Sequence, residues 1–186
     1  RGIFINDEDW GINRWSYKNY EKSKIKGTIG PKTHERIFEL LLRLRANTFW
    51  PAMHECTVPF YFTKGNKETA EKYGLFIGTS HCEPMARNTN GEWFKDGIGE
   101  YNYFTNKDNI IQFWQKRVDE LRGSNVIYTL GIRGIHDSGM LGSKNIEDQK
   151  KILTRVLSDQ RNLLSESHGK DVTRIPQVLI PYKEVL

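Results

Sequence analysis

Ionisable side chains follow each of five short apolar runs in this chain. These polar segments are residues 6–10, 50–55, 80–83, 133–137 and 182–184. The opposite ends of the runs read Gly2, Ala46, Gly74 and Pro176 and carry no ionisable side chain there. Merely solvated residues would fall equally at both ends, so the pattern predicts a functional site at one end of the runs.

The residue types in these segments suit the cleavage of an acidic sugar. Asp7, Asp137 and Glu184 offer carboxylates from different runs, and glycoside hydrolysis needs a pair of carboxylates, one as acid and one as base or nucleophile. Arg133 can form a bidentate pair with a sugar carboxylate, and Trp50 can stack on a sugar face. Purely structural explanations of these residues stay open. Arg133 could pair with Asp137 across a turn, and Glu184 could lie in the first turn of a helix, where acidic residues are favoured.

A metal-dependent hydrolase is the main alternative on the residues alone. The candidate ligands would be His54, His81, His136, Asp7 and Asp137. No HxH or HExxH spacing supports that set, so glycoside hydrolysis without a metal is preferred. A lone histidine is also more often hydrogen-bonded than catalytic.

The apolar runs predict parallel strands that alternate with helices. The strands are expected at residues 3–5, 47–50, 75–79, 126–130 and 176–180. The clearest helix follows Thr33, where Ile37, Leu40, Leu41 and Leu44 recur at helical spacing and predict the buried face. Further helices are expected at 66–73, 106–121 and 146–165, and residues 12–32 and 85–105 are expected to be loops. Such βα units bring the carboxyl ends of the strands together, where ligands bind.

The length of the chain limits this α/β architecture. Strand starts near residues 3 and 177 enclose four units of roughly 44 residues, and eight units would need about 350 residues. The 186 residues therefore predict a partial (β/α)8 TIM barrel with about the first five strands, so that residues 1–186 are the truncated N-terminal part of a catalytic domain. An open doubly wound sheet is the alternative, but no GxGxxG or GxxxxGK[ST] follows any strand.

Composition argues against several classes of partner. The net charge is +5, yet the 28 Lys and Arg are interspersed with 23 Asp and Glu, which is weak support for nucleic-acid binding. No apolar run approaches the roughly 18 residues that a membrane span requires. Cys56 and Cys82 lack the spacing of a structural zinc site. The expected partners therefore include neither nucleic acid nor membrane.

Several long blocks resemble glycoside hydrolase family 115, the xylan α-1,2-glucuronidases. In chain order the blocks are RGIFINDEDWG at 1–11, ELLLRLRANTFWPAMHE at 39–55, GTSHCEPMARN at 78–88, EW at 92–93, TLGIRGIHD at 129–137, DQR at 159–161 and IPQVLIPYKEV at 175–185. They extend over the whole chain, and several are rich in rare residue types.

The resemblance implies a multidomain, secreted or periplasmic enzyme with a (β/α)8 catalytic barrel. Its reaction would be the removal of 4-O-methyl-glucuronic acid, α-1,2-linked to xylose, from glucuronoxylan or an aldouronic acid, with inversion and without a cofactor or metal. The resemblance also implies that the remaining domains of a longer chain are partners of this one, and it is compatible with a homodimer.

The same resemblance implies the roles of particular residues. Asn6, Trp50, His81 and Arg133 would bind the substrate, and the catalytic set would be Glu184, Asp137 and Asp7. Glu184 is expected to be the general acid, with Asp137 or Asp7 activating water, although the roles of Asp137 and Glu184 are interchangeable on the sequence. Inversion needs these carboxyl groups roughly 6.5–9.5 Å apart.

Two expectations concern the ending at Leu186, just after the fifth run. The missing strands would carry further pocket groups, so the isolated chain is expected to be inactive. A degenerate half-barrel that binds acidic xylan without cleaving it is the alternative from a different functional class.

Overall fold

The computed structural model describes residues 1–6 and 11–182 and divides the chain into two compact units. Unit 1 contains residues 1–78 and 124–126, and unit 2 contains residues 79–123 and 127–186. The predicted site residues Asp7 and Glu184, together with Trp10, lie outside the described residues. In the described part of the chain, no helix is both long and apolar enough to cross a membrane.

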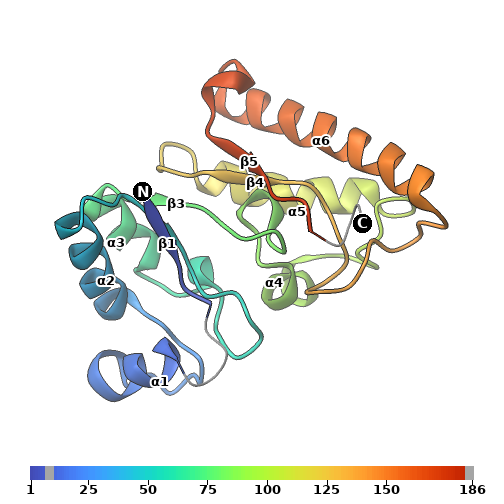
Figure 1. Ribbon diagram of the computed structural model, residues 1–186. Helices are drawn as coiled ribbons and strands as arrows, with labels where there is room; N and C mark the ends of the chain where they lie inside the picture. The colour runs from blue at the N-terminus through green and yellow to red at the C-terminus, as the bar shows by residue number, and fades with distance from the viewer. Residues whose placement is uncertain (7–10, 183–186) are drawn as a thin grey trace. The chain divides into compact units, whose positions relative to one another are not determined.

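Strands and helices alternate along the chain (Figure 1). The strands are β1 (Gly2–Phe4), β2 (Thr48–Trp50), β3 (Phe76–Ile77), β4 (Tyr128–Leu130) and β5 (Gln177–Leu179). The α-helices are α1 (Ile12–Ser16), α2 (Pro31–Arg43), α3 (Asn66–Tyr73), α4 (Thr89–Asp96), α5 (Lys107–Glu120) and α6 (Ile146–His168). A π-helix spans Tyr17–Glu21, and 3-10 turns span Phe60–Phe62, Pro84–Ala86 and Val172–Arg174.

Every strand pairing in the described sheets is parallel, which confirms the predicted α/β class. In unit 1 the strand order is β1-β2-β3, and an isolated parallel bridge joins Ile77 to Val126. In unit 2, β4 pairs with β5, and Thr129 lies opposite Val178. Each of the five predicted strands exists, although β3 is shorter than the apolar run predicts because only Phe76 and Ile77 extend into the ladder.

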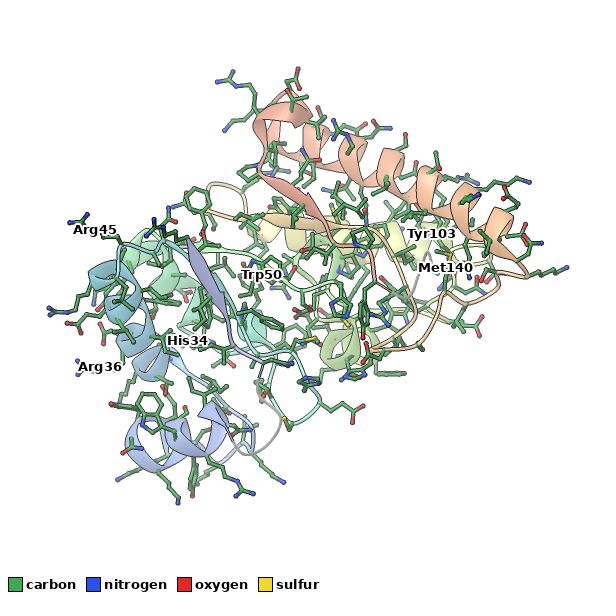
Figure 2. All side chains as sticks on the ribbon, in the orientation of Figure 1. His34, Arg36, Arg45, Trp50, Tyr103 and Met140 are labelled. Carbon is green, nitrogen blue, oxygen red and sulfur yellow. The ribbon has the colours of Figure 1, made fainter. Side chains whose placement is uncertain are left out.

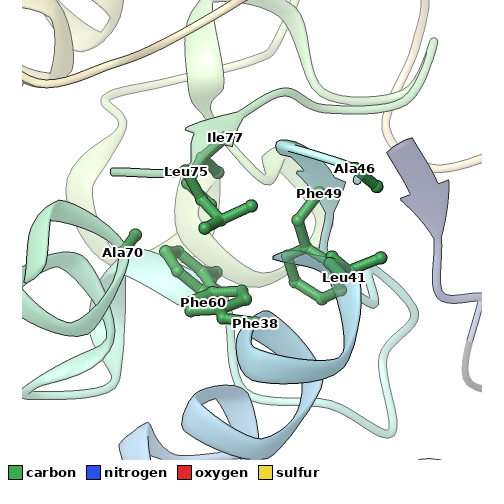
Figure 3. Packing of buried hydrophobic residues seen from close by; sticks show 8 residues of the cluster. All are labelled: Phe38, Leu41, Ala46, Phe49, Phe60, Ala70, Leu75 and Ile77. Carbon is green, nitrogen blue, oxygen red and sulfur yellow. The ribbon is translucent and has the colours of Figure 1, made fainter. Parts of the chain in front are cut away.

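The core of unit 1 lies between the sheet and helices α2 and α3 (Figure 3). Figure 3 shows Phe38 and Leu41 of α2 together with Phe49 of β2, Ile77 of β3 and Ala70 of α3. Phe38 and Phe49 contact each other edge to face with their ring centroids 5.3 Å apart, a favourable geometry for aromatic pairs. Large rings and small residues together fill the space between the helices and the sheet.

The buried face of α2 differs from the face that the sequence predicts. The predicted stripe included Leu40 and Leu44, but these residues are 56% and 64% exposed. The helix instead buries His34, Phe38 and Leu41, again at helical spacing but rotated around the axis. Polar His34 is buried because its Nδ1 lies 3.1 Å from both Gly30 O and Asn66 Oδ1, so a polar partner on α3 decides the rotation.

Two segments expected to be loops contain helices. Residues 12–32 include α1 and the π-helix, and residues 85–105 include α4. The side chain of Asn88 caps α4 by accepting a hydrogen bond from Gly91 N at 2.8 Å, and Trp93 and Tyr101 are 3% and 2% exposed. Trp93, Tyr101 and Tyr103 are therefore part of the core of unit 2 and not of the surface loop that the sequence suggested, whereas Phe94 and Phe104 are exposed.

In unit 2, helices α5 and α6 pack against each other beside the β4–β5 pair (Figure 1). Val118 of α5 and Val156 and Leu164 of α6 are fully buried. Gln160 of α6 makes two hydrogen bonds to Gly131, the residue after β4. Its side-chain oxygen accepts from Gly131 N and its side-chain nitrogen donates to Gly131 O, each at 2.8 Å. This contact fixes the backbone immediately before Arg133.

Candidate functional site

In unit 1, the ends of β1 and β2 carry two of the predicted substrate-binding residues. Asn6 is exposed two residues beyond β1, and Ile5 N donates to Trp50 O at 2.9 Å. Trp50 ends β2 and is half-buried, with its ring 5.9 Å from that of Phe4. The parallel register of β1 and β2 therefore brings the Asn6 and Trp50 positions to the same edge of the sheet, as predicted.

Trp50, which is labelled in Figure 2, depends on a glycine for its position. A Cβ atom on Gly78 would lie 2.2 Å from Trp50 Nε1, which is too close for any side chain. Gly78 directly follows β3, so the indole lies against bare backbone beyond the end of the neighbouring strand. A ring supported in this way presents a defined apolar face, which suits stacking on a sugar.

In unit 2, five residues that follow the third, fourth and fifth strands form one cluster, called here the Asp137 cluster: His81, Cys82, Arg133, Asp137 and Tyr182. Asp137 Oδ1 lies 3.2 Å from Arg133 Nη2, 3.7 Å from His81 Nε2 and 3.9 Å from Cys82 Sγ. The rings of His81 and Tyr182 are 4.5 Å apart between centroids, and the Arg133 guanidinium lies 5.5 Å from the Tyr182 ring. Three of the predicted site residues thus meet.

Burial is unequal across the Asp137 cluster. The side chain of Arg133 is 1% exposed, whereas that of Asp137 is 47% exposed and Tyr182 is 41% exposed. Arg133 Nη1 donates to Cys82 Sγ at 3.5 Å, and Nη2 makes the ion pair with Asp137 Oδ1 at 3.2 Å. A buried guanidinium thus lies 3.2 Å from a carboxylate that is accessible to solvent.

A tight turn after β4 positions Asp137. Gly134 N donates to Ser138 O at 3.1 Å, and a Cβ atom on Gly134 would lie 2.4 Å from Gly139 O, so only glycine fits. His136 has a φ of 54°, a left-handed conformation that is unusual for a residue with a side chain. Such backbone strain persists only where the surroundings enforce it and often marks functional sites.

Glu83, next to Cys82 in the chain, is a buried carboxyl group. It is 4% exposed, and its Oε2 accepts hydrogen bonds from Ser80 N at 3.2 Å and Ser80 Oγ at 3.3 Å. Burial raises the pKa of Glu83 from 4.5 to about 8, mainly because the charged form loses its hydration. Glu83 therefore closes the turn that carries His81 and Cys82 and is protonated at neutral pH.

Stability should accordingly depend on pH through Glu83. Between pH 4.5 and about 8 the folded protein keeps a proton that the unfolded chain releases, so the free energy of unfolding falls as pH rises through this window. Glu83→Gln keeps the shape and the acceptor oxygen but cannot ionise, and we expect it to be more stable than the parent at pH 8 by a few kcal/mol and nearly equal at pH 4. Urea unfolding at several pH values measures the free energy of unfolding of the parent and of the Glu83→Gln variant. Exposed Glu166→Gln is the control, and a Glu83→Gln effect that is the same at pH 4 and pH 8 would refute the protonated state.

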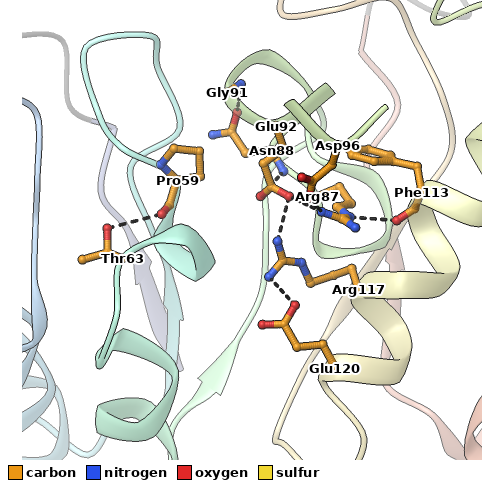
Figure 4. A network of polar contacts seen from close by, with 10 residues as sticks. All are labelled: Pro59, Thr63, Arg87, Asn88, Gly91, Glu92, Asp96, Phe113, Arg117 and Glu120. Atoms are coloured by element: carbon orange, nitrogen blue, oxygen red, sulfur yellow. Dashed lines mark hydrogen bonds and ion pairs between the residues drawn. The ribbon is translucent and has the colours of Figure 1, made fainter. Parts of the chain in front are cut away.

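A buried ionic network supports the segment that follows Glu83 (Figure 4). Glu92 Oε2 lies 2.7 Å from both Arg87 Nη1 and Arg117 Nη2, and the Glu92 side chain is 1% exposed. Asn88 N donates to Glu92 Oε1, and Arg87 Nε donates to Phe113 O at 2.8 Å. The network joins α4 to α5 and thereby fixes the backbone behind Cys82 and Glu83.

Part of the Asp137 cluster has ligand types that metals bind. One nitrogen of His81, the sulfur of Cys82 and a carboxylate oxygen of Asp137 lie within 4.8 Å of one another. The guanidinium of Arg133 contacts two of these three groups, and its positive charge opposes a second cation there. Of the wider ligand set considered from the sequence, His54 belongs to unit 1 and Asp7 lies outside the described residues.

Three further residues of the predicted segments lie beside the predicted site residues in the structure. Cys82, Glu83 and Tyr182 each lie next to a predicted site residue or segment, and all three contact the turn or the cluster. Their position directly after the predicted strands was the available signal. The predicted separation of the catalytic carboxyl groups stays a prediction, because Asp7 and Glu184 lie outside the described residues.

Comparisons with known proteins were made for the sequence and for the structure. The model of Glycosyl hydrolase family 115 matches residues 1–186. A solved structure, described as a novel family GH115 4-O-methyl-α-glucuronidase with specificity for decorated arabinogalactans, is 63% identical with a TM-score of 0.96. The alignment covers 100% of this chain and 24% of that one, so this chain spans about a quarter of its relative. No curated protein matches significantly.

These matches agree with the blocks in which the resemblance was seen. The family model matches residues 1–186, and the blocks lie in order between residues 1 and 185. A sequence identity of 63% over the full chain, with a TM-score of 0.96, is a likeness of both sequence and fold. The chain therefore belongs to glycosyl hydrolase family 115.

Proposed function

We propose that this chain contributes the first part of the catalytic domain of an inverting glycoside hydrolase that removes α-1,2-linked (4-O-methyl)glucuronic acid from glucuronoxylan. Membership of family 115 supports a glycosidase, and the solved relative is described as a 4-O-methyl-α-glucuronidase. The parallel strands with helices between them support the first five strands of a (β/α)8 barrel. The other strands and domains would come from a longer chain.

The observation that carries this proposal is the accessible Asp137 carboxylate beside buried Arg133. Asp137 Oδ1 lies 3.2 Å from Arg133 Nη2, and roughly half of the Asp137 side chain is exposed to solvent. An accessible carboxylate can accept a proton from water, as the base of an inverting glycosidase must. The guanidinium of Arg133 has the planar donor geometry that suits the carboxylate of a uronic acid.

The remaining roles follow from the chemistry of inversion. Glu184 acts as the general acid that protonates the departing xylose oxygen, and Asp137 or Asp7 activates water on the opposite face. His81 lies 3.7 Å from Asp137, so it can donate a hydrogen bond to a ring hydroxyl or to that carboxylate. Trp50 and Asn6 bind the sugar by stacking and by hydrogen bonding.

Decorated arabinogalactan is a second candidate substrate. The solved relative, 63% identical to this chain, is described as specific for decorated arabinogalactans. The uronic acid recognised by the Asp137 cluster would be the same, and only the sugar that leaves would differ. The two substrates are therefore separated by the acceptor side of the pocket and not by Arg133 or Asp137.

Release of glucuronic acid by the full-length protein tests this proposal. We expect Asp137→Asn and Glu184→Gln each to lower kcat by about 10³-fold on an aldouronic acid, because general acid–base groups contribute 10²- to 10⁴-fold. NMR of the first product should show the β-anomer, since inversion of an α-linkage gives β. Exposed Asp108→Asn is the control and should keep the parental rate.

The alternatives predict different results in the same assay. Unchanged release by both variants would refute the assignment of the carboxylates, and loss of activity in a chelator would favour the metal-dependent hydrolase. Binding of acidic xylan without any release by the parent protein would favour the binding-only alternative. Comparing rates on decorated arabinogalactan and on glucuronoxylan identifies the polysaccharide.

A further inference from the structure

A cavity of about 530 Å³ opens in unit 1, within the segment 13–28. It is formed by α1, the π-helix and the turn that follows, and the described ones among the predicted site residues do not line it. Four of its lining side chains are cationic, namely Arg14, Lys18, Lys24 and Lys26, and among residues 1–6 and 11–182 no acidic side chain lines it. The cavity is therefore a basic pocket.

The segment that forms the basic pocket is much more basic than the rest of the chain. Residues 13–28 contain five Lys and Arg against a single acid, Glu21, whereas the whole chain has a net charge of +5. Glu21 does not line the pocket, and its Oε1 accepts a hydrogen bond from Thr33 N at 2.9 Å in the first turn of α2. No carboxylate of the described residues pairs with the four lining cations.

The walls of the basic pocket are fixed to the core of unit 1. Asn13 Nδ2 donates to Cys56 O at 2.9 Å, and buried Ser16 Oγ lies 2.7 Å from Thr33 Oγ1. On the other wall, Gly27 has a φ of 83° and approaches Cys56 so closely that a Cβ atom would lie 2.2 Å from its carbonyl oxygen. The cations are thus displayed by a backbone that is held in place on both sides.

Two further features point to a ligand. The segment Tyr17–Glu21 is a π-helix, a rare conformation that occurs frequently at functional sites. Tyr17 lines the cavity and is 57% exposed, so its ring is available for stacking on a sugar. An aromatic ring among fixed cations suits a sugar chain that carries carboxylates.

We propose that the basic pocket binds a polysaccharide that carries uronic acid residues, with Lys18, Lys24 and Lys26 pairing with a uronate and Tyr17 stacking on a neighbouring sugar. This inference rests on the proposed function, because it takes the polymer of that reaction as the ligand. It adds a second binding site on unit 1 that holds the polymer through uronates other than the one cleaved.

The test replaces three lysines and measures binding without turnover. In the full-length protein carrying Asp137→Asn, the triple variant Lys18→Gln, Lys24→Gln, Lys26→Gln is compared with Lys116→Gln, Lys144→Gln, Lys151→Gln, which removes the same charge from exposed positions in unit 2. Affinity electrophoresis uses glucuronoxylan and the same polymer after chemical reduction of its carboxyl groups. A single-stranded DNA oligonucleotide is the third probe.

We expect the pocket variant to bind glucuronoxylan about tenfold more weakly than the parent, and the control variant to stay within about twofold. Reduction of the carboxyl groups should abolish the difference, and so should high salt. Equal weakening in both triple variants, an unchanged difference with the reduced polymer, or tighter pocket-dependent binding of the oligonucleotide would each overturn the proposal. Because binding requires no cleavage, failure of the proposed reaction would be seen separately in the release assay.

Discussion

Replacing Glu92 by Gln is expected to lower the free energy of unfolding by about 3–5 kcal/mol. The Glu92 side chain is 1% exposed, and its carboxylate lies 2.7 Å from a guanidinium nitrogen of both Arg87 and Arg117, whose side chains are 3% and 1% exposed. Gln keeps the volume but removes the buried negative charge, so that Arg87 and Arg117 keep only their ion pairs with the more exposed Asp96 and Glu120. Breaking a buried pair by changing one partner is costly for this reason.

The network supplies its own control for this effect. Arg117 Nη1 also pairs with Glu120 at 3.0 Å, but the Glu120 side chain is 47% exposed. Glu120→Gln removes the same charge where water replaces it, so we expect a loss of at most about 1 kcal/mol. Urea unfolding of both variants makes the comparison. Equal losses of unfolding free energy in the two variants would contradict the expectation that burial makes the ion pairs of Glu92 more stabilising than that of Glu120.

The second large effect is expected at Arg133. Arg133→Met should lower kcat/KM for a glucuronide by about 10²- to 10³-fold, since truncating one partner of a buried, hydrogen-bonded charge pair costs 2–5 kcal/mol. Arg133→Lys should recover only part of the loss, because an ammonium group cannot form the two parallel hydrogen bonds that a guanidinium gives to a carboxylate. Exposed Arg174→Met serves as the control.

A neutral substrate separates two roles of Arg133. If the guanidinium binds the uronate, Arg133→Met should lower kcat/KM for the corresponding glucoside, which lacks the carboxylate, by less than about tenfold. If Arg133 acts only by holding Asp137, to which it lies at 3.2 Å, the glucuronide and the glucoside should lose activity equally. Equal losses would refute recognition of the uronate by Arg133.

Local patterns in the sequence predicted most of the elements correctly. All five strands, the α/β class and helices α2, α3, α5 and α6 follow from apolar spacing, glycine stops and proline positions. The predicted segments also contain every described member of the Asp137 cluster, since each follows a parallel strand. These features depend on neighbours in the chain, so the sequence alone is sufficient for them.

The predictions of which residues are buried were partly wrong, because burial depends on what packs against an element. Leu40 and Leu44 belong to the most apolar stripe of α2, yet contacts of His34 with Asn66 and of Phe38 with Phe49 turn another face inward. The sequence predicts a loop in place of helix α4 because the segment is rich in polar residues, which usually lie at the surface. Glu92 is an exception, since it is buried between two arginines.

The order of the elements and the membership of family 115 follow from the sequence alone, and the match over residues 1–186 confirms the family. Three properties emerge only when the chain is folded: Arg133 is buried beside Asp137, Glu83 holds its proton to about pH 8, and the lysines after α1 line a cavity. The physical reason is that charge, hydration and pKa depend on groups brought close by folding, which spacing along a chain does not encode.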